Sequence, residues 1–195
     1  MKLAFLGSSV TYGFASNGIS FVELLCEKNG YDYIKETVSG TTLVDSDDNS
    51  YISRLKRINK NENIDLFVVQ LSTNDASRNF ELKEIEKAVK EIINYINVTF
   101  ACKIIFYSNP YYLNDNYQKM VNMMYSLDED FVFIDMYSDC EFNNISNQLK
   151  NEYMADDIHP TLKGYQEWLM PYIEKIIKKT MWLLFNFTLL FKFCN

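Results

Sequence analysis

The residues best suited to acid–base chemistry lie in one short stretch, Asp156-Asp157-Ile158-His159-Pro160, which contains the only histidine of the chain. A histidine oriented by a carboxylate is a common general base near neutral pH, because its imidazole changes charge in that range. Pro160 biases the residue before it towards an extended backbone, so we expect a rigid turn here and not a helix. Either Asp156 or Asp157 can face the imidazole from such a turn. An ordinary surface turn before the last helix is the alternative interpretation.

Three polar turns follow apolar segments elsewhere in the chain: Gly7–Gly13, Ser39–Thr42 and Ser72–Asp75. Each comes directly after a segment with the pattern of a strand. In a parallel sheet the carboxyl ends of the strands meet at one edge, and ligands bind there. We therefore expect these turns to meet the loop that carries His159.

Strands alternate with helices along the chain, which favours one α/β domain with a parallel sheet. The nearly continuous apolar run from Ile64 to Leu71 is typical of a strand that is covered on both faces. The other expected strands are Lys2–Leu6, Tyr31–Val38, Lys103–Tyr107 and Phe131–Asp135. The expected helices are Ile19–Glu27, Tyr51–Ile58, Glu81–Ile96, Asn116–Leu127 and Thr161–Lys179, of which Glu81–Ile96 has the clearest apolar face.

Ser9 is a candidate nucleophile within the first turn. A serine hydroxyl attacks a carbonyl at neutral pH only when a base takes its proton, and His159 is the only imidazole available. The oxyanion that forms needs donors, which the backbone N–H of Ser9, the backbone N–H of Gly40 and the side-chain amide of Asn74 can supply. Taken singly, each residue has a structural alternative: a tight turn at Gly7–Gly13, a turn glycine at position 40, and a helix cap at Asn74.

The order of these segments resembles the SGNH (GDSL-type) hydrolase family. Gly7-Ser8-Ser9-Val10-Thr11 resembles its Gly-Asp-Ser block, and Gly40 stands where its second block has a glycine. Ser72-Thr73-Asn74-Asp75 resembles its Gly-x-Asn-Asp block, and the stretch from Asp156 to Pro160 matches its Asp-x-x-His-Pro block. The resemblance covers positions 3 to 179.

This resemblance implies a flavodoxin-like, three-layer α/β/α fold with about five parallel strands. It implies a catalytic triad of Ser9, His159 and Asp156, an oxyanion hole formed by Ser9, Gly40 and Asn74, and ester hydrolysis through an acyl-enzyme without a metal or cofactor. Two residues depart from the family pattern: Ser8 replaces the usual Asp, and Ser72 replaces the usual Gly. Both departures bear more on substrate and loop shape than on the reaction.

Composition limits the partners of this protein. The chain has 195 residues and a net charge of −7, which argues against nucleic acid as a partner. The four cysteines are scattered without a C-x-x-C pair, so neither a zinc site nor another metal site is expected. The N-terminus is read directly as a strand and not as a signal peptide, so a cytoplasmic location is expected.

The segment after Lys179 differs from the rest, so we divide the chain into a hydrolase domain at 1–179 and an apolar, aromatic tail at 180–195. Apolar residues occupy every odd position from Met181 to Phe193, and this period of two favours a strand over a helix. An extra edge strand, a self-association surface that would make a homo-oligomer, a membrane-surface anchor and a segment foreign to the domain all remain open. The negative charge argues against anionic membranes.

The leading hypothesis is a serine esterase that acts on a small-molecule ester with a short acyl group, such as an O-acetyl group on a carbohydrate. The loops Phe14–Gly18 and Asn109–Asn116, which include Tyr111 and Tyr112, are candidates to line the substrate. The alternatives are a lysophospholipase or thioesterase for longer acyl chains, a membrane-surface lipase that uses the tail, and a binding module that hydrolyses nothing.

Overall fold

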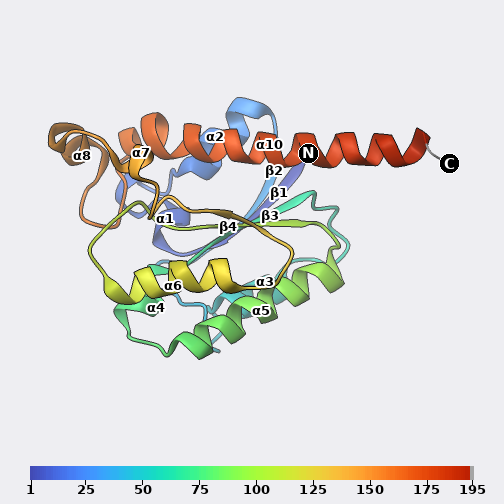
Figure 1. Ribbon diagram of the computed structural model, residues 1–195, viewed down its shortest axis with the longest axis horizontal. Coiled ribbons are helices and arrows are strands. Elements are labelled where there is room, and N and C mark those ends of the chain that lie inside the picture. Colours follow the sequence, from blue (N-terminus) through green and yellow to red (C-terminus); the bar gives the residue numbers. More distant parts are fainter. Residues whose placement is uncertain (194–195) are drawn as a thin grey trace.

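Five parallel strands form the central sheet of the protein (Figure 1). The computed structural model describes residues 1–193, with side chains to residue 183. The strands are β1 (Lys2–Gly7), β2 (Asp32–Thr37), β3 (Leu66–Gln70), β4 (Lys103–Tyr107) and β5 (Val132–Ile134), in the order β2-β1-β3-β4-β5. The chain turns to one side of β1 to form β2 and crosses to the other side to form β3. The carboxyl ends next to that reversal are where ligands bind in such sheets.

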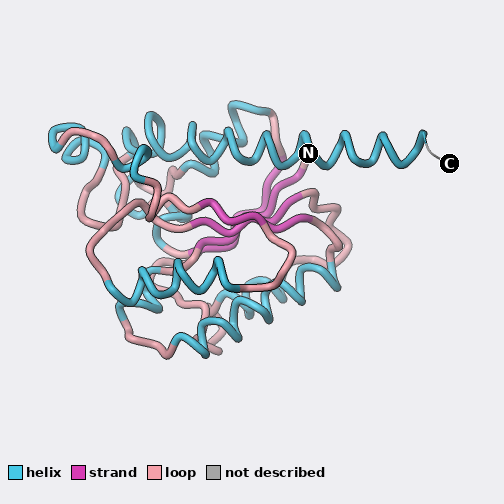
Figure 2. Tube along the Cα trace, viewed as in Figure 1, coloured by secondary structure: helices cyan, strands magenta, loops and turns pink. Residues whose placement is uncertain are grey.

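Helices cover both faces of the sheet, so the molecule has three layers (Figures 1 and 2). One layer contains α3 (Tyr51–Arg57), α5 (Leu82–Thr99) and α6 (Asp115–Ser126). The other contains α2 (Phe21–Asn29), α7 (Cys140–Asn143), α8 (Asn147–Tyr153), the π-helical turn η2 (Tyr165–Leu169) and α10 (Met170–Phe193). Short helices at the carboxyl ends of the strands complete the fold: α1 (Ser9–Tyr12), the 3-10 turn η1 (Phe14–Ser16), α4 (Thr73–Ser77) and α9 (Leu162–Gly164). The expected α/β/α fold with a parallel sheet of about five strands is confirmed.

The alternation of side chains along each strand divides the core in two. Leu3 and Phe5 of β1 pack against α2 and α10, whereas Ala4 and Leu6 pack against the layer of α3, α5 and α6. Both sets are fully buried. A strand that buries both faces needs apolar residues at every position, which explains the continuous apolar run of β3.

The helices begin and end where their sequences supply hydrogen-bonding groups. In α2 the Ser20 hydroxyl accepts from the Val22 N–H, and the Glu23 carboxylate accepts from the Ser20 N–H. Gly30 then ends the helix with a left-handed φ of 63°. The expected boundaries of α2, α3, α5 and α6 agree with the structure to within about three residues. The expected helix from Thr161 to Lys179 is instead three segments, because a π-turn at Tyr165–Leu169 separates α9 from α10.

The tail does not form the expected strand. Helix α10 continues past Lys179 to Phe193 without a break, so the expectation from its period of two is wrong over the described backbone. The apolar odd-numbered residues beyond Leu183 lie outside the described side chains. Within the described residues, no helix is long and apolar enough to cross a membrane.

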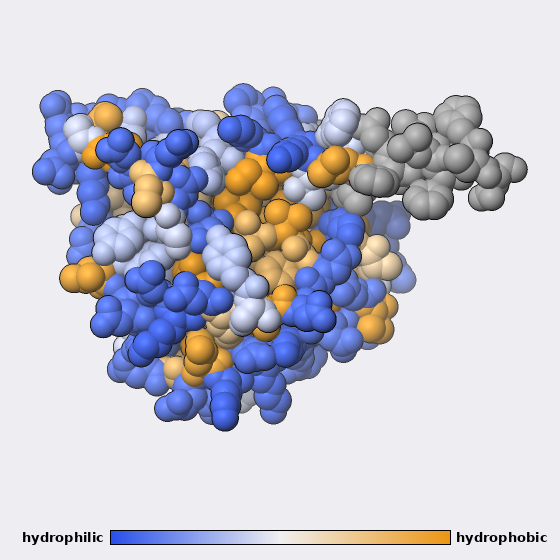
Figure 3. Space-filling model, viewed as in Figure 1, coloured by the Kyte–Doolittle hydropathy of each residue, from blue (hydrophilic) through white to orange (hydrophobic). Residues whose placement is uncertain are grey.

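The edge strand β5 leaves apolar surface partly uncovered. It has three residues, and its Val132 and Phe133 are only half-buried. Figure 3 shows apolar residues on this side of the molecule, between α10 and the opposite helix layer. So short an edge offers few free backbone groups to another chain, which limits edge-to-edge pairing.

Glu174 joins α10 to α2. Its carboxylate, 10% exposed, accepts hydrogen bonds from Lys178 at 2.8 Å, Lys28 at 2.7 Å and Asn29 at 2.8 Å. Burial by itself raises the pKa of this carboxyl group, but these three donors outweigh it and lower the pKa to about 2. A lowered pKa means that the ionised group stabilises the fold above its ordinary range, and that the contribution is lost as pH falls towards 2.

We predict that Glu174→Gln destabilises the protein by roughly 2 kcal/mol at pH 7, because half-exposed lysines reduce the full linkage value. The deficit should shrink as pH falls below about 4.5, where the Glu174 carboxyl of the unfolded chain begins to protonate while the native one stays ionised. Urea denaturation at pH 7 and pH 3 measures both. Glu86→Gln is the control, since it removes an exposed pair with Lys90 and should cost less than about 0.5 kcal/mol. A deficit that is equal at the two pH values would contradict the prediction.

Candidate active site

Ser9 lies at the first position of α1, directly after the carboxyl end of β1, and is 5% exposed. The turn before it is tight, because a Cβ on Gly7 would lie 1.7 Å from the Thr11 hydroxyl oxygen. Only glycine allows that approach. The turn therefore presents the serine hydroxyl at the edge of the sheet where the carboxyl ends of the strands meet.

His159 lies on the loop between α8 and α9. The carboxylate of Asp156 fixes this loop, because its Oδ1 accepts from the N–H groups of Ile158 at 2.8 Å and His159 at 2.7 Å. The N–H of Ala155 donates to the His159 carbonyl at 2.9 Å, and Met154 and Pro160 form an antiparallel bridge. The expected rigid turn is present.

Ser9, His159 and Asp156 form a continuous chain of contacts. The Ser9 Oγ lies 2.9 Å from His159 Nε2, and His159 Nδ1 lies 2.7 Å from Asp156 Oδ2. Burial raises the pKa of Asp156, but its hydrogen bonds from His159 and Ile158 outweigh this and hold the pKa below its ordinary value. An ionised Asp156 can stabilise an imidazolium at His159. Its competitor Asp157 is exposed, and the carboxylate that contacts the imidazole is that of Asp156.

The two other predicted oxyanion donors lie on the turns after β2 and β3. Gly40 has a φ of 79°, a left-handed conformation that favours glycine, although a Cβ there would meet no atom within 4 Å. The Asn74 amide at the start of α4 donates to the Thr41 carbonyl at 2.9 Å, and Arg78 donates to the Gly40 carbonyl at 2.8 Å. These bonds join the two turns to each other. The Asn74 amide nitrogen carries two hydrogens, so it can donate a second hydrogen bond besides the one to Thr41.

Residues 5–167 match the model of the GDSL-like lipase/acylhydrolase family. The chain belongs to that family. No curated protein matched the chain.

Solved structures with the same fold have low sequence identity to this hydrolase. A lipolytic G-D-S-L family protein from Veillonella parvula is 14% identical with a TM-score of 0.72, and the match covers 91% of this chain and 98% of that one. A psychrotrophic esterase from Pseudoalteromonas sp. is 17% identical with a TM-score of 0.69, covering 92% and 98%. A family two carbohydrate esterase from Clostridium thermocellum is 16% identical with a TM-score of 0.67, covering 92% and 64%.

Two further residues hold the Gly40 turn of this GDSL-family hydrolase, and sequence reasoning did not find them. The fully buried Asp75 carboxylate accepts from the N–H groups of Leu43 at 2.9 Å and Val44 at 3.1 Å. Burial raises the pKa of Asp75 to about 6, despite these hydrogen bonds. The buried Arg54 donates to the Thr41 hydroxyl at 3.0 Å. The sequence signal that could have revealed the buried position of Arg54 is its place on an otherwise apolar face of α3, beside Tyr51 and Leu55.

The predicted lining loops reach the site unequally. The ring of Phe14 packs on His159 with centroids 4.9 Å apart and is 59% exposed. Tyr111 is 46% exposed, whereas Tyr112 is buried against Tyr117 and Tyr137 and belongs to the core. Phe14 is therefore the aromatic residue of these loops that borders the imidazole.

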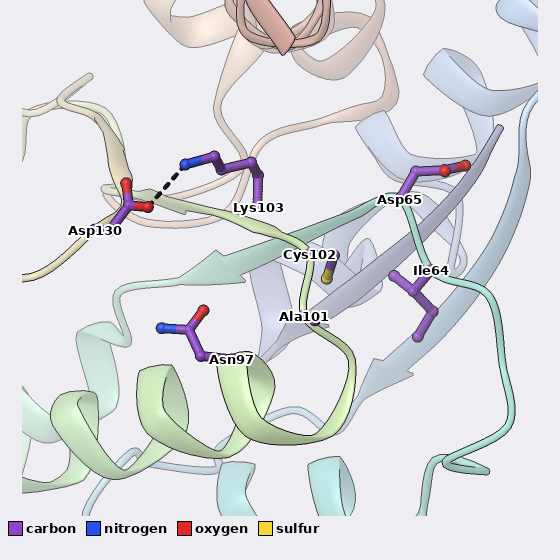
Figure 4. Close-up of a pocket in the computed structure, with 7 residues that line it drawn as sticks. All are labelled: Ile64, Asp65, Asn97, Ala101, Cys102, Lys103 and Asp130. Carbon is purple, nitrogen blue, oxygen red and sulfur yellow. Dashed lines mark hydrogen bonds and ion pairs between the residues drawn. The ribbon is translucent and has the colours of Figure 1, made fainter. Parts of the chain in front are cut away.

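A hollow of about 460 Å³ lies at the opposite edge of the sheet (Figure 4). It is lined by residues that directly precede β3 and β4, among them Asp65 and Cys102, and by the ion pair between Lys103 and Asp130. Burial raises the pKa of the Cys102 thiol to about 11, so it is protonated at neutral pH. This hollow contains none of the predicted site residues. In the described part of the chain no three His, Cys, Asp or Glu side chains cluster to hold a metal ion.

We predict that Asp156→Asn lowers kcat by about 100-fold or more, because an amide can neither fix the imidazole tautomer nor stabilise its charge. Asp157→Asn is the matched control and should stay within about twofold of wild type, since an exposed surface substitution changes little. Hydrolysis of p-nitrophenyl acetate by both variants measures this. The reverse ranking would assign the role to Asp157.

We predict that Asp75→Asn changes how stability depends on pH. A pKa raised to about 6 means that the native carboxyl stabilises the fold below about pH 4 and that this contribution is lost as pH rises through 6. The unfolding free energy of the variant minus that of wild type should therefore rise between pH 4 and pH 8, by roughly 2 to 3 kcal/mol. Urea denaturation across this range tests it, and parallel pH curves for the two proteins would contradict it.

Proposed function

We propose that this protein is a serine esterase that removes small acyl groups through an acyl-enzyme. The contact of Ser9 Oγ with His159 Nε2, in line with the Asp156 carboxylate, is the observation that supports this most directly. Membership of the GDSL-like lipase/acylhydrolase family supports the reaction class.

In the proposed mechanism the Ser9 oxygen attacks the ester carbonyl carbon while its proton passes to His159 Nε2. The carbonyl oxygen takes the negative charge and accepts hydrogen bonds from the Ser9 N–H, the Gly40 N–H and the Asn74 amide. The C–O bond to the alcohol then breaks, and the imidazolium gives its proton to the departing alcohol oxygen. His159 then takes a proton from a water molecule as the water oxygen attacks the acyl carbon. The bond from that carbon to Ser9 Oγ breaks, the imidazolium returns its proton to Ser9 Oγ, and the acid is released.

The exposure of the triad supports a short acyl group and a bulky alcohol. The side chain of Asp156 is 54% exposed and that of His159 is 20% exposed, so the proposed triad is open to solvent on the side of its histidine and aspartate, whereas Ser9 is 5% exposed. The alcohol oxygen must approach His159, beside which Phe14 presents an exposed ring. An aromatic face beside the leaving group suits the apolar face of a sugar ring. We propose an O-acetyl carbohydrate as the substrate class, residues 1–179 as the hydrolase unit, and no catalytic role for residues 180–195.

We predict that Ser9→Ala lowers the hydrolysis rate of p-nitrophenyl acetate by about 1,000-fold or more. Ser8→Ala is the matched control, because it removes the hydroxyl of the neighbouring residue, which donates to Gln70 Oε1 at 3.3 Å and does not contact His159 in any described hydrogen bond. Acetate, butyrate and octanoate esters are assayed in parallel with an acetylated xylose oligomer. Equal, feeble rates in wild type and Ser9→Ala would favour a binding module that hydrolyses nothing. A preference for octanoate would favour a lysophospholipase or thioesterase.

A further inference from the structure

The loop that carries His159 makes most of its hydrogen bonds within itself. The bonds of Asp156 and the Ala155 N–H, described above, set the shape of the loop but not its position on the sheet. Within the described part of the chain, two hydrogen bonds join residues 154–160 to residues outside 150–161. One is the contact of His159 with Ser9, and the other is a bond from the Asn109 amide to the Ile158 carbonyl at 3.3 Å.

Asn109 is the end of a buried pair of amides that begins at the Ser9 turn. Gln70, the last residue of β3, accepts at its Oε1 from the Ser8 N–H at 2.9 Å and the Thr11 hydroxyl at 2.8 Å. Its Nε2 donates to Asn109 Oδ1 at 3.2 Å. Gln70 and Asn109 are both fully buried. We call this pair the amide relay.

The direction of the amide relay is fixed at both ends. The Ser8 N–H can only donate, so Gln70 must present its oxygen there and its nitrogen to Asn109. Asn109 must then present its oxygen to Gln70 and its nitrogen to Ile158, whose carbonyl can only accept. Reversing either amide would leave two buried donors or two buried acceptors facing each other, which is unfavourable because neither group is then hydrogen-bonded.

The backbone of Asn109 is also held in place. Its N–H donates to the Tyr117 hydroxyl at 2.9 Å, and that hydroxyl donates to the Leu71 carbonyl at 2.9 Å. Tyr117 is fully buried. The Asn109 side chain therefore extends from a fixed backbone position shortly after β4. Its hydrogen bond to the Ile158 carbonyl can hold the His159 loop in place.

We propose that Asn109, oriented by Gln70, is a positioning residue that sets the distance between the Ser9 turn and the His159 loop. This inference rests on the proposed function, because it concerns the same serine and histidine. Asn109 does not touch the reacting atoms. Its hydrogen bond holds the residue before His159, so that Nε2 remains within reach of the Ser9 hydroxyl.

The test compares Asn109→Ala and Asn109→Asp with wild type on p-nitrophenyl acetate at pH 9. We expect kcat to fall about 30-fold in both variants, because a displaced base loses catalytic efficiency steeply, while KM stays within about twofold. The aspartate keeps the volume and the contact with Gln70, but its ionised oxygen cannot donate to Ile158 O. A normal kcat in Asn109→Asp would show that the donated hydrogen bond has no role.

Two further variants separate positioning from general destabilisation. Asn29→Ala removes an amide that bridges α2 and α10 far from Ser9, and it should lower the melting temperature without changing kcat. Because Asn109 acts through His159, the double variant Asn109→Ala/His159→Ala should be no slower than His159→Ala alone. A double variant that is slower by the full factor of Asn109→Ala would overturn the proposal. Ser9→Ala, run in parallel, distinguishes the outcomes: if it is inactive while Asn109→Ala is normal, only the positioning role fails.

Discussion

The proposed active site depends on a contact of 2.9 Å between two side chains that are 150 residues apart in the chain, Ser9 Oγ and His159 Nε2. Neither residue lies in the sheet itself. Ser9 begins a four-residue helix after β1, and His159 lies on a loop after α8. A hydrogen bond of this kind tolerates errors of only a few tenths of an ångström, so both segments need fixed positions on a common support. The parallel sheet supplies that support, because its strands bring their carboxyl ends to one edge.

Buried polar side chains at this edge of the sheet hold the turns of the proposed site in position through their hydrogen bonds. Asp75 and Arg54 hold the Gly40 turn, and the Asn74 amide joins that turn to α4. Gln70 and Asn109 connect the Ser9 turn with the His159 loop. Burying such groups costs free energy unless each is hydrogen-bonded, so their bonds fix one arrangement and disfavour the others. The raised pKa of Asp75, about 6, is a measure of that cost.

The packing of the layers and the short connections between them explain why the residues around the proposed site are exposed. The core fills the space between the sheet and the helices, and the connections from β1 to α1 and from β3 to α4 are short. Phe14 and Tyr111 remain exposed at this edge, whereas Tyr112 packs into the core. The half-exposed Asp156 beside the imidazole supports the proposed bulky alcohol and short acyl group.

The sequence by itself determined the fold class and the approximate positions of the five strands, and it predicted Ser9 and His159 of the proposed triad. Strand segments that alternate with helical segments along the chain favour a parallel sheet, and the polar turns that follow the strands can be recognised by residue type alone. Two things were decided only by the tertiary structure. The first is that Asp156, and not Asp157, contacts the imidazole, because this depends on the shape of the loop. The second is that the backbone of the tail is helical as part of α10, although its apolar residues recur with a period of two. The roles of Gln70, Asp75 and Asn109 were hidden because hydrogen bonds between distant segments leave no periodic signal in the sequence.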